Sequence, residues 1–352
     1  MRVVFETERM KYSHTGLYYY CLNLGNALLN SAPLDMQLSF YHNERAELVF
    51  GDDKNYIKQK SIDKFLKLSW KGFDLYHANY QLSPYLPKKG KTKVVLTIHD
   101  LNFIAEGKTP AKIKKYLGKV QANIDRAVAV VAISNFVKED VEKHCKLGNK
   151  KIEVIYNGSN IDPEKIKLAS PESPIDGPFL FSIGTIAAKK NFHVLPFLLV
   201  NNNYKLVISG IIQEEDYYQK IKAIAKSLGL EDRVILTGPV SEEEKYSYLK
   251  HCSLFVFPSL AEGFGLPVIE AMSFGKKVLL STYTSLPEIG GKEAFYLESM
   301  DANYLQDFAT NKLEMIIQGE DRSDEIKAWA GQFSWETAAK AYWDLYQSIL
   351  RS

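Results

Sequence analysis

The stretch "SLFVFPSLAEGFGLPVIEAMSFGKKVLLST", residues 253–282, decides the fold of this chain. It begins as an apolar strand pattern, passes through a loop with Gly263 and Gly265, and continues as a helical pattern up to Gly275. A second strand pattern follows. Pro267 suits the first turn of a helix, because an N–H at that position would have no helical partner. The stretch therefore predicts a strand–helix–strand unit with its helix over residues 266–274.

The same rhythm of short apolar strands and longer helical patterns runs through the whole chain. Continuous valine, isoleucine and leucine runs are typical of parallel sheets that are covered by helices on both faces. The fold class is therefore α/β, with two Rossmann-like doubly wound units. The predicted strands are "RVVFE", "MQLSFY", "DLYHA", "VVLTIHD", "AVAVVAIS" and "IEVIYNG", then "FLFSIG", "KLVISG", "RVILTG", "SLFVFPS", "KVLLST" and "AFYLE".

The boundary between the two units is predicted from a change of pattern. A chain of 352 residues is too long for one ordinary core. The stretch "PEKIKLASPESPIDGP", residues 163–178, is rich in proline and has no periodicity, which favours a linker. We therefore expect domains over residues 1–165 and 166–332, and a closing helix over 333–352.

The composition excludes several classes of protein. Three scattered cysteines without CxxC spacing favour a reducing compartment and argue against a structural metal site. The N-terminus has a strand pattern and lacks a signal-peptide core, and no run of about 18 apolar residues occurs. We expect a cytoplasmic protein that needs no metal.

Charge is distributed unevenly along the chain. Residues 1–170 carry 27 Lys and Arg against 18 Asp and Glu, a balance of 27 − 18 = +9, although the whole chain is only +2. The basic half could meet an anionic lipid surface, a phosphate-bearing acceptor or nucleic acid, and ordinary solvated lysines explain it equally well. No aromatic-interleaved basic motif occurs, so nucleic acid is not an expected partner.

Two glutamates, Glu262 and Glu270, bracket the glycine loop with seven residues between them. Glycines allow a backbone to approach a ligand closely, and the start of a helix favours an anion. A diphosphate at this helix start, with a carboxylate on either side to accept hydrogen bonds from sugar hydroxyls, fits the spacing. The alternative is two solvated charges, one in a loop and one on a helix.

A second phosphate signal is the stretch "FSIGTIAAKKNFHVL". Its strand ends at Gly184, and Lys189 and Lys190 follow before a predicted helix. Two ammonium groups at the carboxyl end of a strand suit a diphosphate leaving group, although a solvated start of a helix is the plain alternative. No Walker sequence and no strand-following GxGxxG occurs, which weakens the hypotheses of an NTPase and of a dehydrogenase.

The first half offers candidates at the ends of its own strands. His99 and Asp100 end "VVLTIHD", and Gly16 lies in the first strand–helix loop. Polar residues at carboxyl ends of parallel strands face the edge where ligands bind. Three consecutive tyrosines, residues 18–20, cannot share one helix face, so at least one should reach an edge or a ligand.

These motifs together resemble a known family. "PSLAEGFGLPVIEAM" resembles the E-x7-E signature of retaining glycosyltransferase family 4, whose members have the GT-B fold of two Rossmann-like domains facing across a cleft. "IGTIAAKKN", "TIHDLNF", "AISNFVKEDV", "VIYNGSNID" and "LTGPVSEEEKYSYLKHCSLFVFPS" are similar to family segments in the same order. The segments "GTIAAKKN" and "TIHDLNF" are similar to those of bacterial family members that transfer mannose or rhamnose in cell-surface polysaccharide synthesis.

The resemblance implies roles for particular residues. Glu270 should bind ribose hydroxyls of a nucleotide-sugar donor, Glu262 should contact the transferred sugar, and Lys190 with Lys189 should bind the diphosphate. The last helix should cross back to the first domain. The implied catalytic residues are Glu262, His99 and Lys190; the implied donor-binding residues are Glu270, Lys189, Thr185, Gly184, Gly263, Phe264, Gly265, Leu266, Gly238 and Val240; the acceptor-side residues are Gly16 and Asp100.

Two departures from the family pattern affect these roles. Thr185 follows Gly184 where many members carry arginine, and Lys189 stands where a subgroup has arginine, so phosphate contacts should be weaker or monodentate. The N-terminal loop "HTGLYY" has one glycine where many members have more.

The implied reaction is hexose transfer with retention of configuration. The donor would be a GDP-, dTDP- or UDP-hexose and the acceptor a glycan or a polyprenyl-diphosphate-linked sugar. The leaving phosphate oxygen could take the acceptor proton, so no protein base is required.

Lys112, Lys115 and Lys119 on a predicted helix could hold the protein at the inner face of the cell membrane. Solvated lysines on an ordinary helix explain them equally well.

Two other classes compete with a transferase. A glycoside hydrolase or phosphorylase would use the two glutamates as acid and nucleophile, which requires carboxyls roughly 5–10 Å apart across a bond. A non-catalytic nucleotide-sugar binder would bind without turnover and would be unaffected by Glu262→Gln.

Overall fold

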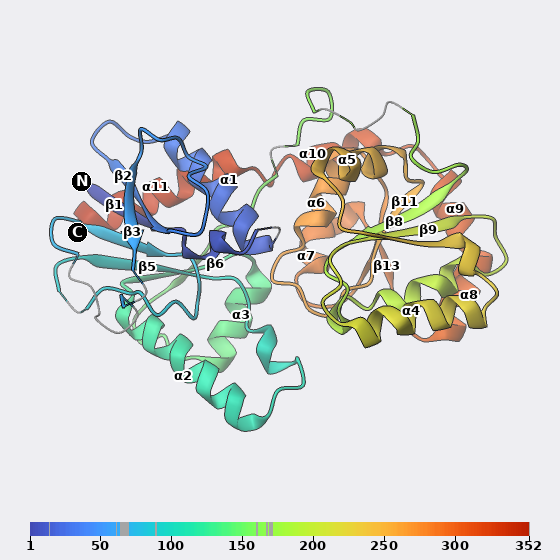
Figure 1. Cartoon of the computed structure of the whole chain (residues 1–352), viewed down its shortest axis with the longest axis horizontal. Coiled ribbons are helices and arrows are strands. Elements are labelled where there is room, and N and C mark those ends of the chain that lie inside the picture. Colours follow the sequence, from blue (N-terminus) through green and yellow to red (C-terminus); the bar gives the residue numbers. More distant parts are fainter. Residues whose placement is uncertain are drawn as a thin grey trace. The chain divides into compact units, whose positions relative to one another are not determined.

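The structure is a computed structural model of the whole chain, and it describes residues 1–13, 15–60, 62–63, 70–88, 90–159, 161–166, 168 and 172–351. The chain forms two compact units, the first made of residues 1–158 with 333–352 and the second of residues 159–332. Of the predicted linker, residues 167 and 169–171 lie outside the described residues. Figure 1 shows the elements of each unit.

The first unit contains a seven-stranded, fully parallel sheet in the order β3-β2-β1-β4-β5-β6-β7. The order reverses between β1 and β4, as in a Rossmann sheet. Its strands are β1 (Arg2–Glu6), β2 (Gln37–Asn43), β3 (Asn55–Gln59), β4 (Leu75–Ala78), β5 (Lys93–Ile98), β6 (Ala129–Ala132) and β7 (Ile152–Val154).

Helices cover both faces of this sheet. The helix after β1 and those after β5 and β6 lie on opposite faces, because right-handed crossovers lead away from the reversal point in opposite directions (Figure 1). The helices are α1 (Gly16–Asn30), α2 (Pro110–Arg126), α3 (Asn135–His144) and α11 (Trp335–Arg351), with 3₁₀ turns η1 (Glu8–Lys11) and η2 (Asn102–Ile104).

The second unit repeats the plan with a six-stranded parallel sheet in the order β10-β9-β8-β11-β12-β13. The order reverses between β8 and β11. The strands are β8 (Phe179–Ile183), β9 (Lys205–Ser209), β10 (Val234–Gly238), β11 (Leu254–Phe257), β12 (Val278–Ser281) and β13 (Phe295–Leu297).

Seven α-helices and four 3₁₀ segments are described in this second unit. They are α4 (Glu215–Ser227), α5 (Glu242–His251), α6 (Leu266–Ser273), α7 (Leu286–Gly290), α8 (Ala302–Asn311), α9 (Leu313–Gln318) and α10 (Ser323–Ala330), with η3 (Ala188–Lys190), η4 (Phe192–Leu199), η5 (Glu231–Arg233) and η6 (Gly291–Glu293).

The two parallel sheets confirm the predicted fold class, and α6 confirms the predicted helix to within one residue. Two details were wrong. The helix expected after Lys190 is the 3₁₀ segment η4, because Pro196 inside it cannot donate to an α-helical ladder. Strand β3, "NYIKQ", was missed because it is an edge strand with few apolar residues.

A hydrogen-bonded chain of buried side chains ties α11 to the first sheet. Tyr342 Oη lies 2.9 Å from Tyr20 Oη and 2.9 Å from Thr97 Oγ1. Thr97 Oγ1 lies 2.7 Å from His77 Nε2, and His77 Nδ1 lies 2.5 Å from Tyr346 Oη. Buried polar groups cost free energy unless they are paired, so this chain specifies where α11 docks.

The chain crosses itself closely where α11 begins. A Cβ added to Gly158 would lie 2.1 Å from the backbone nitrogen of Trp335, so no larger residue fits at position 158. Trp335 is itself only 2% exposed. The closing helix is thus part of the first unit, as predicted.

Two buried histidines should make this unit sensitive to acid. Burial lowers the pKa of His77 to about 3, helped by the charge of His99, and burial lowers the pKa of His99 to about 4. An unfolded histidine titrates near 6.5, so the unfolded chain takes up protons that the fold excludes. The two histidines should therefore lower the free energy of unfolding as the pH drops from about 6.5 towards 4, by roughly 2 kcal/mol each at pH 5. Burial raises the pKa of Glu6 to about 8, which acts in the opposite direction, so the histidine loss is read from the difference between the unmodified protein and a histidine variant.

Urea unfolding followed by tryptophan fluorescence at pH 7.5 and pH 5 measures this loss. In His99→Asn the loss should shrink by one histidine's share. An equal loss in the variant and in the unmodified protein would contradict the assignment for His99.

Candidate functional site

The carboxyl ends of β8 and β11 bring the main candidates of the second unit together. The segment after β8 carries Lys189 and Lys190 on η3, and the loop after β11 carries Glu262. These strands are the neighbours at which the strand order reverses. In open α/β sheets this reversal point is where ligands bind.

An ion pair joins the two segments. The ammonium group of Lys190 donates a hydrogen bond to the carboxylate of Glu262, and each side chain is only 13% exposed. The ammonium also lies 5.0 Å from the centre of the Phe257 ring. Unpaired charges are costly at a partly buried position, and the ion pair offsets part of that cost.

The glycine loop leads directly into α6. Gly265 has φ 105°, a left-handed conformation that favours glycine, and Leu266 is the first helical residue. A Cβ at Gly265 would also lie 3.0 Å from the side chain of Leu286. Phe264 is only 3% exposed, so its ring is part of the core and the backbone of the loop is what a ligand would meet.

The segment after β12 holds this loop in place through hydrogen bonds. The backbone N–H of Glu262 donates to Oγ1 of Thr284 over 3.0 Å. The hydroxyl of Ser285 lies 3.1 Å from the carbonyl oxygen of Glu262 and 2.9 Å from that of Phe264. Thr284 has φ 55°, which is strained for a β-branched residue, so the surrounding structure holds it there.

Glu270 is also paired with a lysine. Its Oε1 accepts a hydrogen bond of 3.0 Å from Lys245 Nζ, which comes from α5. Burial is the largest influence on Lys245 and would lower its pKa. The charge of Glu270 and its hydrogen bond, together with the charges of Tyr246 and Glu242, outweigh burial and raise that pKa above the usual range. Both glutamates of the motif are therefore neutralised by lysines that are distant in the sequence.

The remaining predicted residues of this unit lie at or just beyond the carboxyl ends of strands β8 and β10. Gly184 and Thr185 follow β8, and the Gly184 N–H donates to Ser209 O over 2.9 Å. The carbonyl of Gly238, at the end of β10, accepts from the Gly210 N–H over 2.8 Å. Val240 immediately precedes Ser241, the N-cap of α5.

The backbone of Lys189 is hydrogen-bonded to the loop after β11. Its carbonyl oxygen accepts from the Leu260 N–H over 2.8 Å and from Ser259 Oγ over 3.2 Å. These bonds link the segment after β8 to the loop after β11. They hold Lys190 and Glu262 at their mutual distance.

In the first unit, His99 follows β5 and is held in one tautomer. Its Nε2 lies 3.0 Å from the carbonyl oxygen of Asn79, which can only accept, so the proton is on Nε2 and Nδ1 is a free acceptor in the neutral ring. Burial lowers the pKa of His99 to about 4, which keeps the ring neutral at pH 7. The ring of Tyr20 contacts it edge-on at 4.5 Å between centroids.

The two acceptor-side candidates lie near these elements. Oδ1 of Asp100 accepts from the Asn102 N–H over 3.0 Å, so this carboxylate shapes the turn that starts η2. Gly16 is the exposed first residue of α1, one turn before Tyr20. Among the three tyrosines, Tyr20 packs against a candidate residue, His99.

Sequence reasoning missed the supporting residues Lys245, Thr284, Ser285 and Asn79. One signal for Lys245 was available, because it lies four residues before the buried Leu249 and hence on the apolar face of α5. Thr284 and Ser285 carry no such signal, since their partners are backbone groups brought close only by folding.

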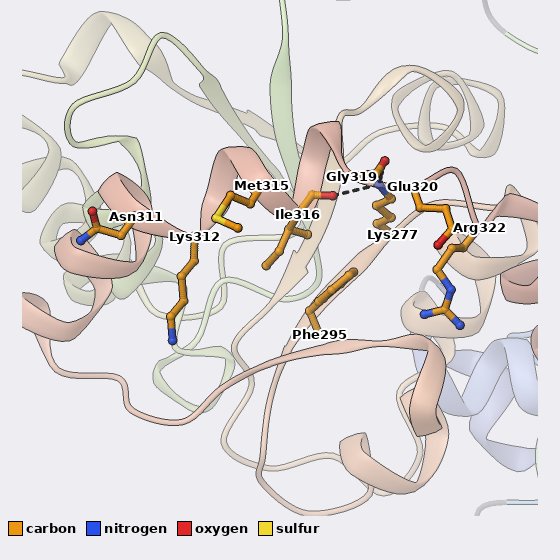
Figure 2. A pocket seen from close by; sticks show the side chains of 9 residues that line it. All are labelled: Lys277, Phe295, Asn311, Lys312, Met315, Ile316, Gly319, Glu320 and Arg322. Carbon is orange, nitrogen blue, oxygen red and sulfur yellow. Dashed lines mark hydrogen bonds between the residues drawn. The ribbon is translucent and has the colours of Figure 1, made fainter.

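An open pocket of about 690 Å³ lies elsewhere in the second unit, at β13 and α9 (Figure 2). Two of its charged groups already have partners: Lys277 Nζ donates to the carbonyls of Ile316 and Gly319 at the end of α9, and Arg322 pairs with Glu293. None of the predicted site residues lines this pocket. It is lined by Lys277, Phe295, Asn311, Lys312, Met315, Ile316, Gly319, Glu320 and Arg322.

The described residues offer neither a metal-binding cluster nor a membrane-spanning helix. Within them, no three histidine, cysteine or carboxylate side chains gather in a way that could hold a metal ion. Across the same part of the chain, no helix is long and apolar enough to cross a bilayer.

Two family descriptions match adjoining parts of the chain. "Glycosyl transferases group 1" matches residues 164–333, and "Glycosyltransferase Family 4" matches residues 42–163. The two matches meet within five residues of the boundary between the compact units.

Curated relatives and solved structures agree with these matches. The serotype-specific mannosyltransferase WbdA of Escherichia coli is 30% identical over 67% of this chain, which spans only 31% of that protein's length. The O-antigen chain mannosyltransferase B of Escherichia coli is 25% identical over 99% of this chain and 100% of its own.

Among solved structures, sucrose-phosphate synthase from Thermosynechococcus elongatus has a TM-score of 0.78 at 18% identity, covering 100% of this chain and 99% of its own. The Anabaena protein HepE, solved with UDP and glucose, has a TM-score of 0.75 at 16% identity, covering 99% and 100%. At such identities these likenesses establish the GT-B fold.

The support of the glycine loop by Thr284 can be tested by a pair of variants. Thr284→Ala removes the acceptor for the Glu262 N–H, whereas Thr284→Ser keeps it. We expect the alanine variant to be about 1 kcal/mol less stable than the serine variant in urea unfolding, and the Glu262 amide to exchange faster with solvent. Equal stability and equal exchange in the two variants would show that the hydroxyl does not hold the loop.

Proposed function

We propose that this chain, which belongs to the group 1 glycosyl transferases of glycosyltransferase family 4, transfers a hexose from a nucleotide-diphospho-sugar to a glycan or lipid-linked acceptor, with retention of configuration. The observation that carries the proposal is the Lys190–Glu262 pair at the reversal point of the second sheet. It provides a cation for a departing diphosphate and a carboxylate for sugar hydroxyls side by side.

The donor would occupy the strand ends of the second unit. Lys190, assisted by Lys189, would bind the diphosphate together with backbone N–H groups of residues 263–266. Glu270 would accept hydrogen bonds from the ribose hydroxyls. The segments around Gly184, Thr185, Gly238 and Val240 would border the phosphates and the base.

The pairing of Lys190 with Glu262 has a mechanistic consequence. To bind a diphosphate, Lys190 must give up part of its interaction with Glu262, which then becomes free to accept a hydroxyl of the sugar. Binding of the phosphate and orientation of the sugar are thereby coupled. As the bond to the leaving phosphate breaks, the lysines would stabilise its growing charge, and a phosphate oxygen would take the acceptor proton.

His99 would act as a neutral group. With its proton held on Nε2 by Asn79, its Nδ1 can accept a hydrogen bond from a sugar hydroxyl or stabilise a cationic sugar. Gly16 and Asp100 would border the acceptor. The lysines supply the neutralising charge, so the proposed reaction needs no metal ion.

The relatives narrow the substrate class. The O-antigen mannosyltransferases that match this chain favour mannose as the transferred hexose and a cell-surface polysaccharide as the product. A hydrolase or phosphorylase is disfavoured, because both motif glutamates are paired with lysines rather than poised as a free acid and a nucleophile.

The proposal is tested by thermal stabilisation against GDP, UDP, ADP and dTDP and their hexose conjugates, with EDTA present. A ligand that binds only the folded state raises the melting temperature. We expect one diphosphate and its sugar conjugate to shift the melting temperature clearly, and discharge of that conjugate to follow an added acceptor. Absence of any shift would refute the donor site, and a shift without turnover would favour a binding protein.

A sharper prediction concerns Glu262→Gln. Removing the carboxylate frees Lys190 for the diphosphate, so affinity for the nucleoside diphosphate should rise a few-fold while turnover falls roughly 100-fold. Titration calorimetry and product formation measure the two effects. Glu231→Gln, at an exposed position of the same unit, is the control. Weaker diphosphate binding in the Glu262 variant would contradict the exchange of partners by Lys190.

We also propose peripheral contact of α2 with anionic lipid. Lys112, Lys115 and Lys119 are exposed on this helix. Reversing their charges should weaken binding to phosphatidylglycerol vesicles by roughly 100-fold, at about 1 kcal/mol per residue. The matched control reverses Lys220, Lys222 and Lys226, which are exposed on α4. Equal effects of the two triple variants would assign the binding to net charge alone.

A further inference from the structure

Lys245 is a lysine in an unusual place. It lies on α5, which begins with a capping box in which Ser241 Oγ accepts from the Glu244 N–H over 3.2 Å and the Ser241 N–H donates to Glu244 Oε2 over 2.8 Å. Four residues beyond Lys245 is Leu249, which is fully buried. The helix therefore turns Lys245 inward, and its side chain is only 13% exposed.

The ammonium group has one close partner. Nζ lies 3.0 Å from Glu270 Oε1, whereas Glu242 Oε1 is 3.9 Å away on a side chain that is 56% exposed. The Tyr246 ring centre lies 4.9 Å from the same nitrogen. Burial would lower the pKa of Lys245, but the charge and hydrogen bond of Glu270, with the charges of Tyr246 and Glu242, raise it, so the lysine keeps its charge throughout the physiological pH range.

The ion pair with Lys245 affects both the charge and the orientation of the Glu270 carboxylate. Glu270 is on the second turn of α6, whose N-terminus is the proposed diphosphate site. A bare carboxylate there would repel an anionic ligand through a partly desolvated medium and would be free to change rotamer. An ammonium group bonded to Oε1 cancels the charge and orients the carboxylate, while the oxygens retain lone pairs for hydroxyl donors.

We propose that Lys245 is a positioning residue for the nucleoside, which holds Glu270 ready to receive the 2′- and 3′-hydroxyls of a ribose. This inference rests on the proposed function, in which Glu270 meets the ribose. Lys245 acts through Glu270 and makes no contact of its own with the diphosphate. Its effect on affinity therefore depends on the presence of the two hydroxyls.

The test compares each nucleoside diphosphate with its analogue that lacks both hydroxyls. Binding of GDP, UDP and ADP and of their 2′,3′-dideoxy forms is measured by titration calorimetry for the unmodified protein, Lys245→Met, Glu270→Ala and the double variant. Methionine keeps the length of the side chain without the charge. Lys250→Met, at an exposed position of the same helix, is the matched control.

We expect Lys245→Met to weaken binding of the preferred ribonucleotide roughly 10- to 100-fold and binding of its dideoxy form by a clearly smaller factor. The unpaired carboxylate of Glu270 repels both ligands, but its lost orientation matters only for the ribose hydroxyls. Glu270→Ala should show the same pattern, and the double variant should be no worse than Glu270→Ala, because the two residues act as one unit. Lys245→Arg should restore most of the loss. The Lys250 variant should bind as the unmodified protein does.

Other outcomes would overturn the inference in distinguishable ways. Equal losses for ribonucleotide and dideoxy form in Lys245→Met would indicate direct ligand contact or a general loss of structure. No loss in that variant, with the unmodified protein still preferring the ribonucleotide, would remove Lys245 while leaving the proposed function intact. If the unmodified protein bound none of the nucleotides, the proposed function would fall first.

Discussion

The structure of the second unit depends on one constraint, which is that two opposite charges must share a partly buried position where the strand order reverses. Lys190 comes from the segment after β8 and Glu262 from the loop after β11, and each side chain is 13% exposed. A single charge at this depth would be costly, and the pair removes that cost. The carbonyl oxygen of Lys189 accepts hydrogen bonds from the Ser259 hydroxyl and the Leu260 N–H, and these bonds keep the two segments at the required distance.

A second lysine–glutamate pair lies on the second turn of α6. Glu270 is paired with Lys245, so both carboxylates of the motif have a lysine partner in the ligand-free chain. An anionic ligand would then meet two neutral pairs instead of two negative charges, and it would draw a lysine from one of them. Thr284 and Ser285 add a rigid frame by bonding the backbone of the intervening loop.

The first unit has a comparable point at its own reversal, between β1 and β4. Asn79, just after β4, donates through Nδ2 to the carbonyl of Glu6 at the end of β1 over 2.7 Å, and its own carbonyl accepts from His99. Burial raises the pKa of Glu6 to about 8, so this carboxyl is largely neutral at pH 7, unlike the two paired glutamates of the second unit.

The sequence by itself determined the local elements and the chemistry of the motif. Apolar runs predicted nearly every strand, because a strand buried on both faces must be apolar throughout. The edge strand β3 was missed because it is less buried and therefore has few apolar residues. Glycine, proline and charge spacing identified Glu262, Glu270 and Lys190 as candidates, and their roles stay predictions.

Only the tertiary structure decided the strand order, the docking of α11 and the partner of each charge. Lys245 meets Glu270, and Thr284 meets the backbone of Glu262, across 25 and 22 residues of chain. Such contacts depend on how helices and loops pack on the sheet, which no local pattern of residues encodes.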